Sequence, residues 1–141
     1  MNFEIRTCTD NDKEQINAGL LAYNFSVIPQ GKDYVSTDIS RRIADENGKV
    51  IAGCIASADC WLCAHVGILW VDGEYRKQGL GSKLLAAVEQ AAREAGCMMI
   101  QLDTFEFQAK DFYLKHGYEV FGEVASPPMG KLHYYLKKDL K

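Results

Sequence analysis

The chain has 141 residues, of which 48% are hydrophobic and 25% are charged, with a formal net charge of −3. This length predicts one domain over residues 1–141, with enough apolar side chains for a single core. The acidic balance disfavours a dedicated nucleic-acid binder, which is normally basic. No apolar run approaches the roughly 20 residues of a membrane span, and the N-terminus has no signal-like core. The five cysteines are an odd number, which favours reduced thiols, so we expect a cytoplasmic protein.

The first quarter of the chain predicts a strand, a helix and an irregular segment. Residues 2–6 alternate between apolar and polar side chains, as a half-buried strand does. Thr9 or Asp10 can cap a helix that runs to about Tyr23. Residues 24–37 then lose the helical pattern around a Pro-Gln-Gly turn. This segment either shapes a binding cleft or connects two elements, and the sequence leaves both interpretations open.

Three strands and a long helix are predicted in the middle of the chain. The strands are expected over residues 41–45, 50–57 and 61–71. Asn47-Gly48, between the first two, is the strongest short signal for a hairpin turn. An amphipathic helix begins at Leu80, and Gly96 is the stop expected just past its C-terminus.

The last third predicts a buried strand, a short helix and two further strands. These are expected over residues 98–104, 108–116, 118–124 and 132–137. Three antiparallel strands that lead into a strand–helix–strand unit predict an α+β fold with a mixed, mostly antiparallel sheet. The final strand is apolar over residues 132–136 and would be costly at an exposed sheet edge, so a homodimer covering that edge is expected.

A basic turn containing two glycines joins the strand over residues 61–71 to the long helix. It reads Arg-Lys-Gln-Gly-Leu-Gly over residues 76–81. Neither a GxGxxG fingerprint nor a Walker A loop can be placed on this stretch. The turn combines cationic side chains, backbone N–H groups and the positive end of a helix dipole, which predicts a site for a phosphate or pyrophosphate. Gly79 and Gly81 lack a Cβ atom, so the backbone could approach the phosphate oxygens closely.

Two motifs resemble those of the GNAT superfamily of N-acetyltransferases. One is the Arg-x-x-Gly-x-Gly turn, and the other is Ala-x-x-Phe-Tyr-x-x-x-Gly-Tyr over residues 109–118. The resemblance covers nearly the whole chain in element order and implies a central sheet flanked by about four helices. It also implies acetyl coenzyme A as the acetyl donor. The cofactor-binding residues that it implies are Leu69 and Val71 for the pantetheine arm, and Arg76, Lys77, Gln78, Gly79, Leu80, Gly81 and Ser82 for the pyrophosphate.

The resemblance implies direct transfer of the acetyl group to a primary amine in a ternary complex. Tyr113 would protonate the leaving sulfur, and an N–H near Leu69 would face the thioester oxygen. The general base stays open between His65, Asp103, Glu106 and a water chain. Glu106 also stands where family members often carry Asn, so a cofactor contact by that amide is not expected.

Several alternatives remain at the level of function. The acceptor is either a small-molecule amine or a peptide amine, and acidic and aromatic residues favour a small cationic amine. These residues are Asp103, Glu106, Trp61 and Tyr134. A non-catalytic module that binds or senses acyl coenzyme A is the alternative to an enzyme. No nucleic-acid, membrane or metal partner is expected, because zinc sites usually need more than the single Cys60-x-x-Cys63 pair.

Overall fold

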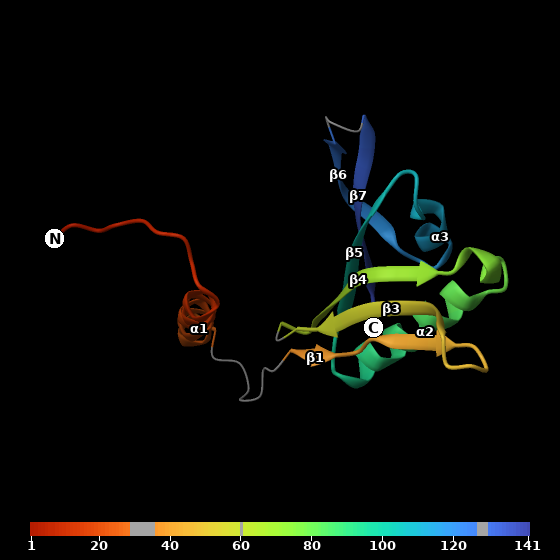
Figure 1. Ribbon diagram of the computed structural model, residues 1–141, viewed down its shortest axis with the longest axis horizontal. Coiled ribbons are helices and arrows are strands. Elements are labelled where there is room, and N and C mark those ends of the chain that lie inside the picture. Colours follow the sequence, from red (N-terminus) through yellow and green to blue (C-terminus); the bar gives the residue numbers. More distant parts are fainter. Residues whose placement is uncertain (29–35, 60, 127–129) are drawn as a thin grey trace. The chain divides into compact units, whose positions relative to one another are not determined.

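The computed structural model describes residues 1–28, 36–59, 61–126 and 130–141. The chain divides into two compact units, Met1–Tyr34 and Val35–Lys141 (Figure 1). A single domain over residues 1–141 stays a prediction. None of the helices among the described residues is long and apolar enough to cross a membrane.

The first unit contains one helix, α1 (Asp10–Val27), whose N-terminus is capped by Thr9. The Thr9 hydroxyl accepts a hydrogen bond from the Asp12 N–H at 3.2 Å, and the Asp12 carboxylate accepts one from the Thr9 N–H at 2.7 Å. This reciprocal capping box confirms the predicted helix start. The predicted strand over residues 2–6 is wrong, because the described structure assigns no strand to residues 1–9. Alternating side chains do not form a strand unless the backbone pairs with a neighbour.

The second unit is built on one seven-stranded sheet. Its strands are β1 (Thr37–Asp38), β2 (Arg41–Ala44), β3 (Val50–Ala58), β4 (Cys63–Val71), β5 (Met99–Phe105), β6 (Glu119–Ser126) and β7 (Lys131–Asp139). The strand order is β1-β3-β4-β5-β7-β6, and β2 also pairs with β3. Among the strand pairs of the described residues, β4 with β5 is the one parallel pair. This confirms the α+β class and the mostly antiparallel sheet.

Two α-helices and one 3-10 turn accompany the sheet. They are α2 (Leu80–Glu94), α3 (Lys110–Lys115) and η1 (Gly73–Tyr75). The described residues therefore form three α-helices, where about four were expected. α2 packs against β3 and β4. Its buried side chains, including Leu84, Leu85 and Val88, join the core made by one face of the sheet.

The strand at the C-terminus is an inner strand and not an edge. β7 pairs with β5 on one side and with β6 on the other. Both sides of β7 are therefore covered within the chain, and a homodimer is not needed to cover them. The short strand β1 was not predicted, because two residues are too few to show a period.

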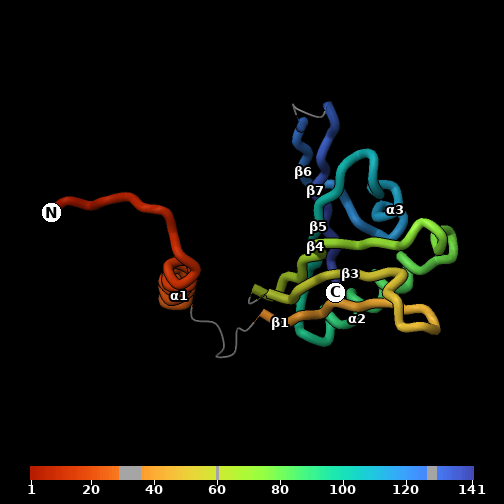
Figure 2. Tube along the Cα trace, in the orientation of Figure 1, coloured from red at the N-terminus to blue at the C-terminus, as the bar shows by residue number. Residues whose placement is uncertain are grey.

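The sheet splits between its two parallel strands. β4 and β5 pair only from Cys63 to Val66, opposite Met99 to Leu102. On the other side of β4, the register with β3 shifts so that Gly67 becomes the extra residue of a β-bulge. Beyond this point β5 turns away from β4 towards α3 (Figure 2). This divergence leaves backbone groups of β4 free to face a ligand.

Candidate functional site

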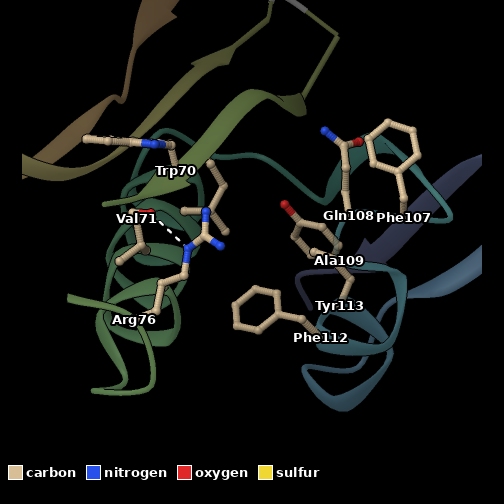
Figure 3. Close-up of a pocket in the computed structure, with 10 residues that line it drawn as sticks. Trp70, Val71, Arg76, Phe107, Gln108, Ala109, Phe112 and Tyr113 are labelled. Carbon is tan, nitrogen blue, oxygen red and sulfur yellow. Dashed lines mark hydrogen bonds between the residues drawn. The ribbon is translucent and has the colours of Figure 1, made fainter. Parts of the chain in front are cut away.

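A cavity of about 520 Å³ lies where β4 and β5 diverge. Residues from the end of β4, the following turn, α2, α3 and the loop before α3 surround it (Figure 3). They are Leu69, Trp70, Val71, Arg76, Gly81, Phe107, Gln108, Ala109, Phe112 and Tyr113. The cavity therefore joins the two motifs that the sequence singled out, although they lie about 30 residues apart in the chain.

A second cavity of about 300 Å³ adjoins the first at the basic turn. Six of the predicted pyrophosphate ligands line it, together with Val71, Tyr75 and Phe112. The six are Arg76, Lys77, Gly79, Leu80, Gly81 and Ser82. The two cavities share Val71, Arg76, Gly81 and Phe112. Gln78 lies in the same turn but lines neither cavity.

The backbone of the turn exposes the start of α2. Lys77 and Gly79 both have positive φ angles, of +63° and +77°. Gly79 is the N-cap of α2 and has no side chain to accept from the first turn. The N–H groups of that turn have no acceptor within the helix, so they remain available to an anion. A Cβ atom at Gly79 would meet nothing within 4 Å, which leaves the space above the turn open.

Gly81 is required for a different reason. A Cβ atom at this position would lie 3.4 Å from Cζ of Phe112 and 3.9 Å from Cγ2 of Val71. Its small size therefore lets α3 pack closely against the start of α2. The sequence predicted that Gly81 serves the approach of a phosphate, and the structure adds this packing role.

Polar side chains tie the basic turn to its surroundings. Arg76 Nε donates to the carbonyl of Val71 at 3.3 Å, which holds the guanidinium at the border of the two cavities (Figure 3). On the other side, His116 Nδ1 lies 2.8 Å from the Phe112 carbonyl and Nε2 lies 3.0 Å from Ser82 Oγ. Because a carbonyl only accepts, Nδ1 carries a hydrogen and donates it. His116 thus links α3 to the first turn of α2.

Tyr113 is buried, with 6% of its surface exposed, and its hydroxyl points into the large cavity (Figure 3). The ring packs edge-on against Phe112 and Tyr118. Burial raises the pKa of Tyr113 to about 12, and the charges of Cys54 and Asp103 add to this. The hydroxyl therefore keeps its proton at neutral pH and can donate a hydrogen bond.

A third, narrow cavity of about 160 Å³ runs into the split itself. Tyr113 and Asp103 both line it, together with Gly67 and Leu69 of β4. Asp103 lies beside two histidines: its Oδ2 is 2.7 Å from His133 Nε2, and its Oδ1 is 3.9 Å from His65 Nε2. Two of the three side chains considered as general base, His65 and Asp103, thus come together. Within the described residues, Glu106 lines none of these three cavities.

The structure adds residues that the sequence did not single out. His133 is 30 positions from Asp103 and shows no local motif, so only the pairing of β5 with β7 reveals their contact. Gln108 lines the large cavity and accepts from the Phe105 N–H at 2.7 Å. Two aromatic residues expected near the cleft are elsewhere. Tyr134 is buried beneath the Lys110 ammonium, and Trp61 lies in the turn between β3 and β4.

The predicted absence of a metal site concerns Cys60 and Cys63. Cys60 lies outside the described residues. In the part of the chain that the structure describes, no group of three or more His, Cys, Asp or Glu side chains could hold a metal ion. Burial raises the pKa of the Cys63 thiol to about 11, and the Asp59 and Cys97 charges contribute less. At neutral pH this residue is therefore a thiol and not a thiolate.

Known proteins resemble this chain over most of its length. Residues 40–120 match the family model described as an acetyltransferase (GNAT) domain. A blasticidin-S acetyltransferase of Streptomyces morookaense is 38% identical over 96 residues, which make up 67% of this chain and 70% of that protein. The crystal structure of an acetyltransferase from Bacillus cereus ATCC 14579 has a TM-score of 0.86 and 34% identity, with 97% of both chains covered. An acetyltransferase of Bacillus anthracis str. Ames, solved in complex with acetyl coenzyme A, shares the fold with a TM-score of 0.65 and 20% identity over 79% of this chain and 70% of its own.

Proposed function

The chain belongs to the GNAT family of acetyltransferases, and we propose that it transfers an acetyl group from acetyl coenzyme A to a primary amine of a small cationic acceptor. The split between β4 and β5 is the observation that carries this proposal. Its cavity joins an anion-binding turn to a protonated tyrosine, so one extended ligand can contact both. We also keep a cytoplasmic location in the proposal, because the odd number of cysteines favours reduced thiols.

The residues around the basic turn fit the phosphate end of acetyl coenzyme A. The open space above Gly79 and the N–H groups at the start of α2 suit a pyrophosphate. Arg76 and Lys77 supply positive charge at the same place, and the Ser82 hydroxyl lines it as well. Along the split, the backbone of Leu69 and Val71 can pair with the amides of the pantetheine arm. Gln78 and Leu80 complete the turn that holds these groups.

Acetyl coenzyme A supplies an activated acyl carbon that an amine can attack. Tyr113 then donates a hydrogen bond to the sulfur as the carbon–sulfur bond breaks, since its hydroxyl is protonated and faces the cavity. Backbone N–H groups of β4 near Leu69 stabilise the negative charge that develops on the acyl oxygen. Attack is direct, in a ternary complex, and the chain contributes no covalent intermediate.

A cationic small molecule is the acceptor class that the site supports. The Asp103 carboxylate lines the narrow cavity in the split, where it can attract an ammonium group. Blasticidin S is the first compound to try, because the relative from Streptomyces morookaense carries this substrate in its name. Peptide amines form the comparison class.

The test is a screen of amines with purified protein and acetyl coenzyme A, read by thiol release and by the mass of the acetylated product. The panel contains blasticidin S, aliphatic diamines and peptides with a free N-terminus or lysine. The Gly79→Glu variant is the control, since its carboxylate would repel the phosphates and abolish coenzyme A binding. If calorimetry detects coenzyme A binding but no amine releases thiol, the protein is a non-catalytic binding module. If only peptides react, the proposed acceptor class is wrong.

A further inference from the structure

Three polar side chains from three adjacent strands meet on the face of the sheet that is turned away from α2. His65 comes from β4, Asp103 from β5 and His133 from β7. Their chain neighbours, such as Val66 and Leu102, are buried in the core, so alternation along each strand places these three on the other face. Each is partly exposed: the exposed fraction of the side chain is 48% for His65, 41% for Asp103 and 20% for His133.

His133 fixes the orientation of the Asp103 carboxylate. Its Nε2 lies 2.7 Å from Asp103 Oδ2, and its ring is stacked on Phe105 at 4.4 Å and packed near Tyr135 at 4.8 Å. A carboxylate accepts, so Nε2 carries the hydrogen of this bond. The other oxygen, Oδ1, makes no hydrogen bond to any described residue and faces His65.

The distance between Asp103 Oδ1 and His65 Nε2 leaves room for one ligand atom. At 3.9 Å the two atoms are too far apart for a hydrogen bond. A single ammonium nitrogen can, however, lie about 2.8 Å from each of them and donate to both. We infer that Asp103 and His65 bind the ammonium group of the acceptor between them, that His65 removes its proton, and that His133 is the positioning residue of this pair.

This inference rests on the proposed acetyl transfer and assigns its acceptor side. Asp103 and Tyr113 line the same narrow cavity, so an amine held at Asp103 approaches the split from the side opposite the basic turn. The negative charge of Asp103 is one of the lesser causes that raise the Tyr113 pKa, which agrees with their proximity. The pair therefore delivers the nucleophile to the cavity in which Tyr113 serves the leaving group.

A separate cavity shows what kind of acceptor fits. It measures about 420 Å³, and His65 lines it together with Asp38 and Gly67. Three serines complete its polar wall: Ser36, Ser40 and Ser57. Asp38 lines this cavity with His65, and Asp103 lies beside His65, so an acceptor with a second positive charge or several hydroxyl groups is favoured over a hydrophobic amine.

Protons and electrons are conserved when these residues carry out the acetyl transfer. One N–H bond of the ammonium breaks, and its proton moves to His65 Nε2, where the Asp103 charge stabilises the imidazolium. The freed lone pair forms the bond to the acyl carbon, and the carbon–sulfur bond breaks with its electrons left on sulfur. Tyr113 donates a hydrogen bond to the sulfur as its charge develops, and the second surplus proton of the nitrogen reaches the thiolate through solvent. His65 then releases its proton to water.

The kinetic test compares three variants in the thiol-release assay with the best amine. We expect His65→Gln to lower kcat/KM for the amine by about 10²-fold and to remove the acidic limb of the pH profile, because the side chain that accepts the proton is gone. Asp103→Asn should raise KM for the amine by about tenfold or more. His133→Ala should lower kcat/KM less, with the acidic limb retained, because His65 is still present. Coenzyme A affinity should stay unchanged in all three.

Glu106→Gln is the matched control, since it removes the other carboxylate considered as base. If His65→Gln and Asp103→Asn stay within twofold of the wild type, or if Glu106→Gln instead loses the acidic limb, the inference is wrong. The proposed function fails separately if none of the amines in the panel causes the wild type to release thiol.

An NMR titration makes the binding part independent of turnover. The chain has only three histidines, so ¹⁵N-labelled imidazole signals can be assigned with single variants. Propylammonium should shift the His65 signal in the wild type, whereas uncharged propanol should not, and Asp103→Asn should abolish the shift. An unchanged His65 signal with propylammonium would overturn the ammonium site.

Discussion

Replacing Tyr113 with phenylalanine tests the role proposed for the leaving group. The change removes one buried oxygen and leaves the ring in place against Phe112 and Tyr118. An ordinary thiol has a pKa near 8.5, so complete proton transfer from a phenol with a pKa of about 12 is uphill by about 5 kcal/mol. Tyr113 therefore acts mainly through a hydrogen bond that strengthens as the sulfur gains charge.

A hydrogen bond to a charged group contributes about 1.5–3 kcal/mol, which corresponds to a loss of about 10- to 150-fold in kcat. The loss should fall on kcat and not on coenzyme A affinity, because the interaction forms fully only in the transition state. The assay is steady-state thiol release with both substrates saturating, together with calorimetric titration of coenzyme A. The wild-type kcat should also lack a descending limb from Tyr113 below about pH 10, because a phenol with a raised pKa keeps its proton there.

Tyr118→Phe is the matched control. Tyr118 is also buried, but its hydroxyl donates to Glu89 at 2.9 Å and lies outside the described cavities. This variant should lose stability while its kcat stays near that of the wild type. A kcat within twofold of the wild type for Tyr113→Phe would return Tyr113 to a purely structural role.

Three further predictions concern stability and the cofactor turn. Gly79→Ala should lower the free energy of unfolding by about 1 kcal/mol, because the φ of +77° at this position disfavours a side chain. Gly79→Asn should lower it less, as measured by urea titration. Equal losses for the two variants would refute backbone strain as the cause. Glu89→Gln should lower the free energy of unfolding by about 3 kcal/mol, since it breaks the 2.9 Å ion pair with Lys138 in a buried site. A double-mutant cycle with Lys138→Met should show an interaction energy between the two residues. The Cys54 pKa is raised by burial from 9.0 to about 11, so the stability it contributes is complete below pH 9 and is lost as pH rises towards 11. Stability should therefore fall by roughly 1 kcal/mol for this thiol between about pH 9 and pH 10, and Cys54→Ala should flatten that slope in urea titrations at the two pH values.

Local chemistry in the sequence determined the elements that depend on neighbours along the chain. The helix start capped at Thr9, the hairpin at Asn47-Gly48 and the stop of α2 at Gly96 are all found where the pattern predicts them, with Gly48 and Gly96 at positive φ. The basic turn and the helix after it were predicted for the same reason. A helix face or a turn needs only a residue type at a fixed spacing, which can be read from the sequence.

Strand pairing was decided by the tertiary structure. The alternation in residues 2–6 predicted a strand that is not formed, and the apolar β7 became an inner strand because β6 folds back beside it. The split that forms the site begins where β4 and β5 stop pairing, at Val66 and Leu102. The contact between Asp103 and His133 likewise depends on the register of β5 with β7. Hydrogen bonds between strands join residues far apart in the chain, and a strand's own period of two does not specify which partner it meets.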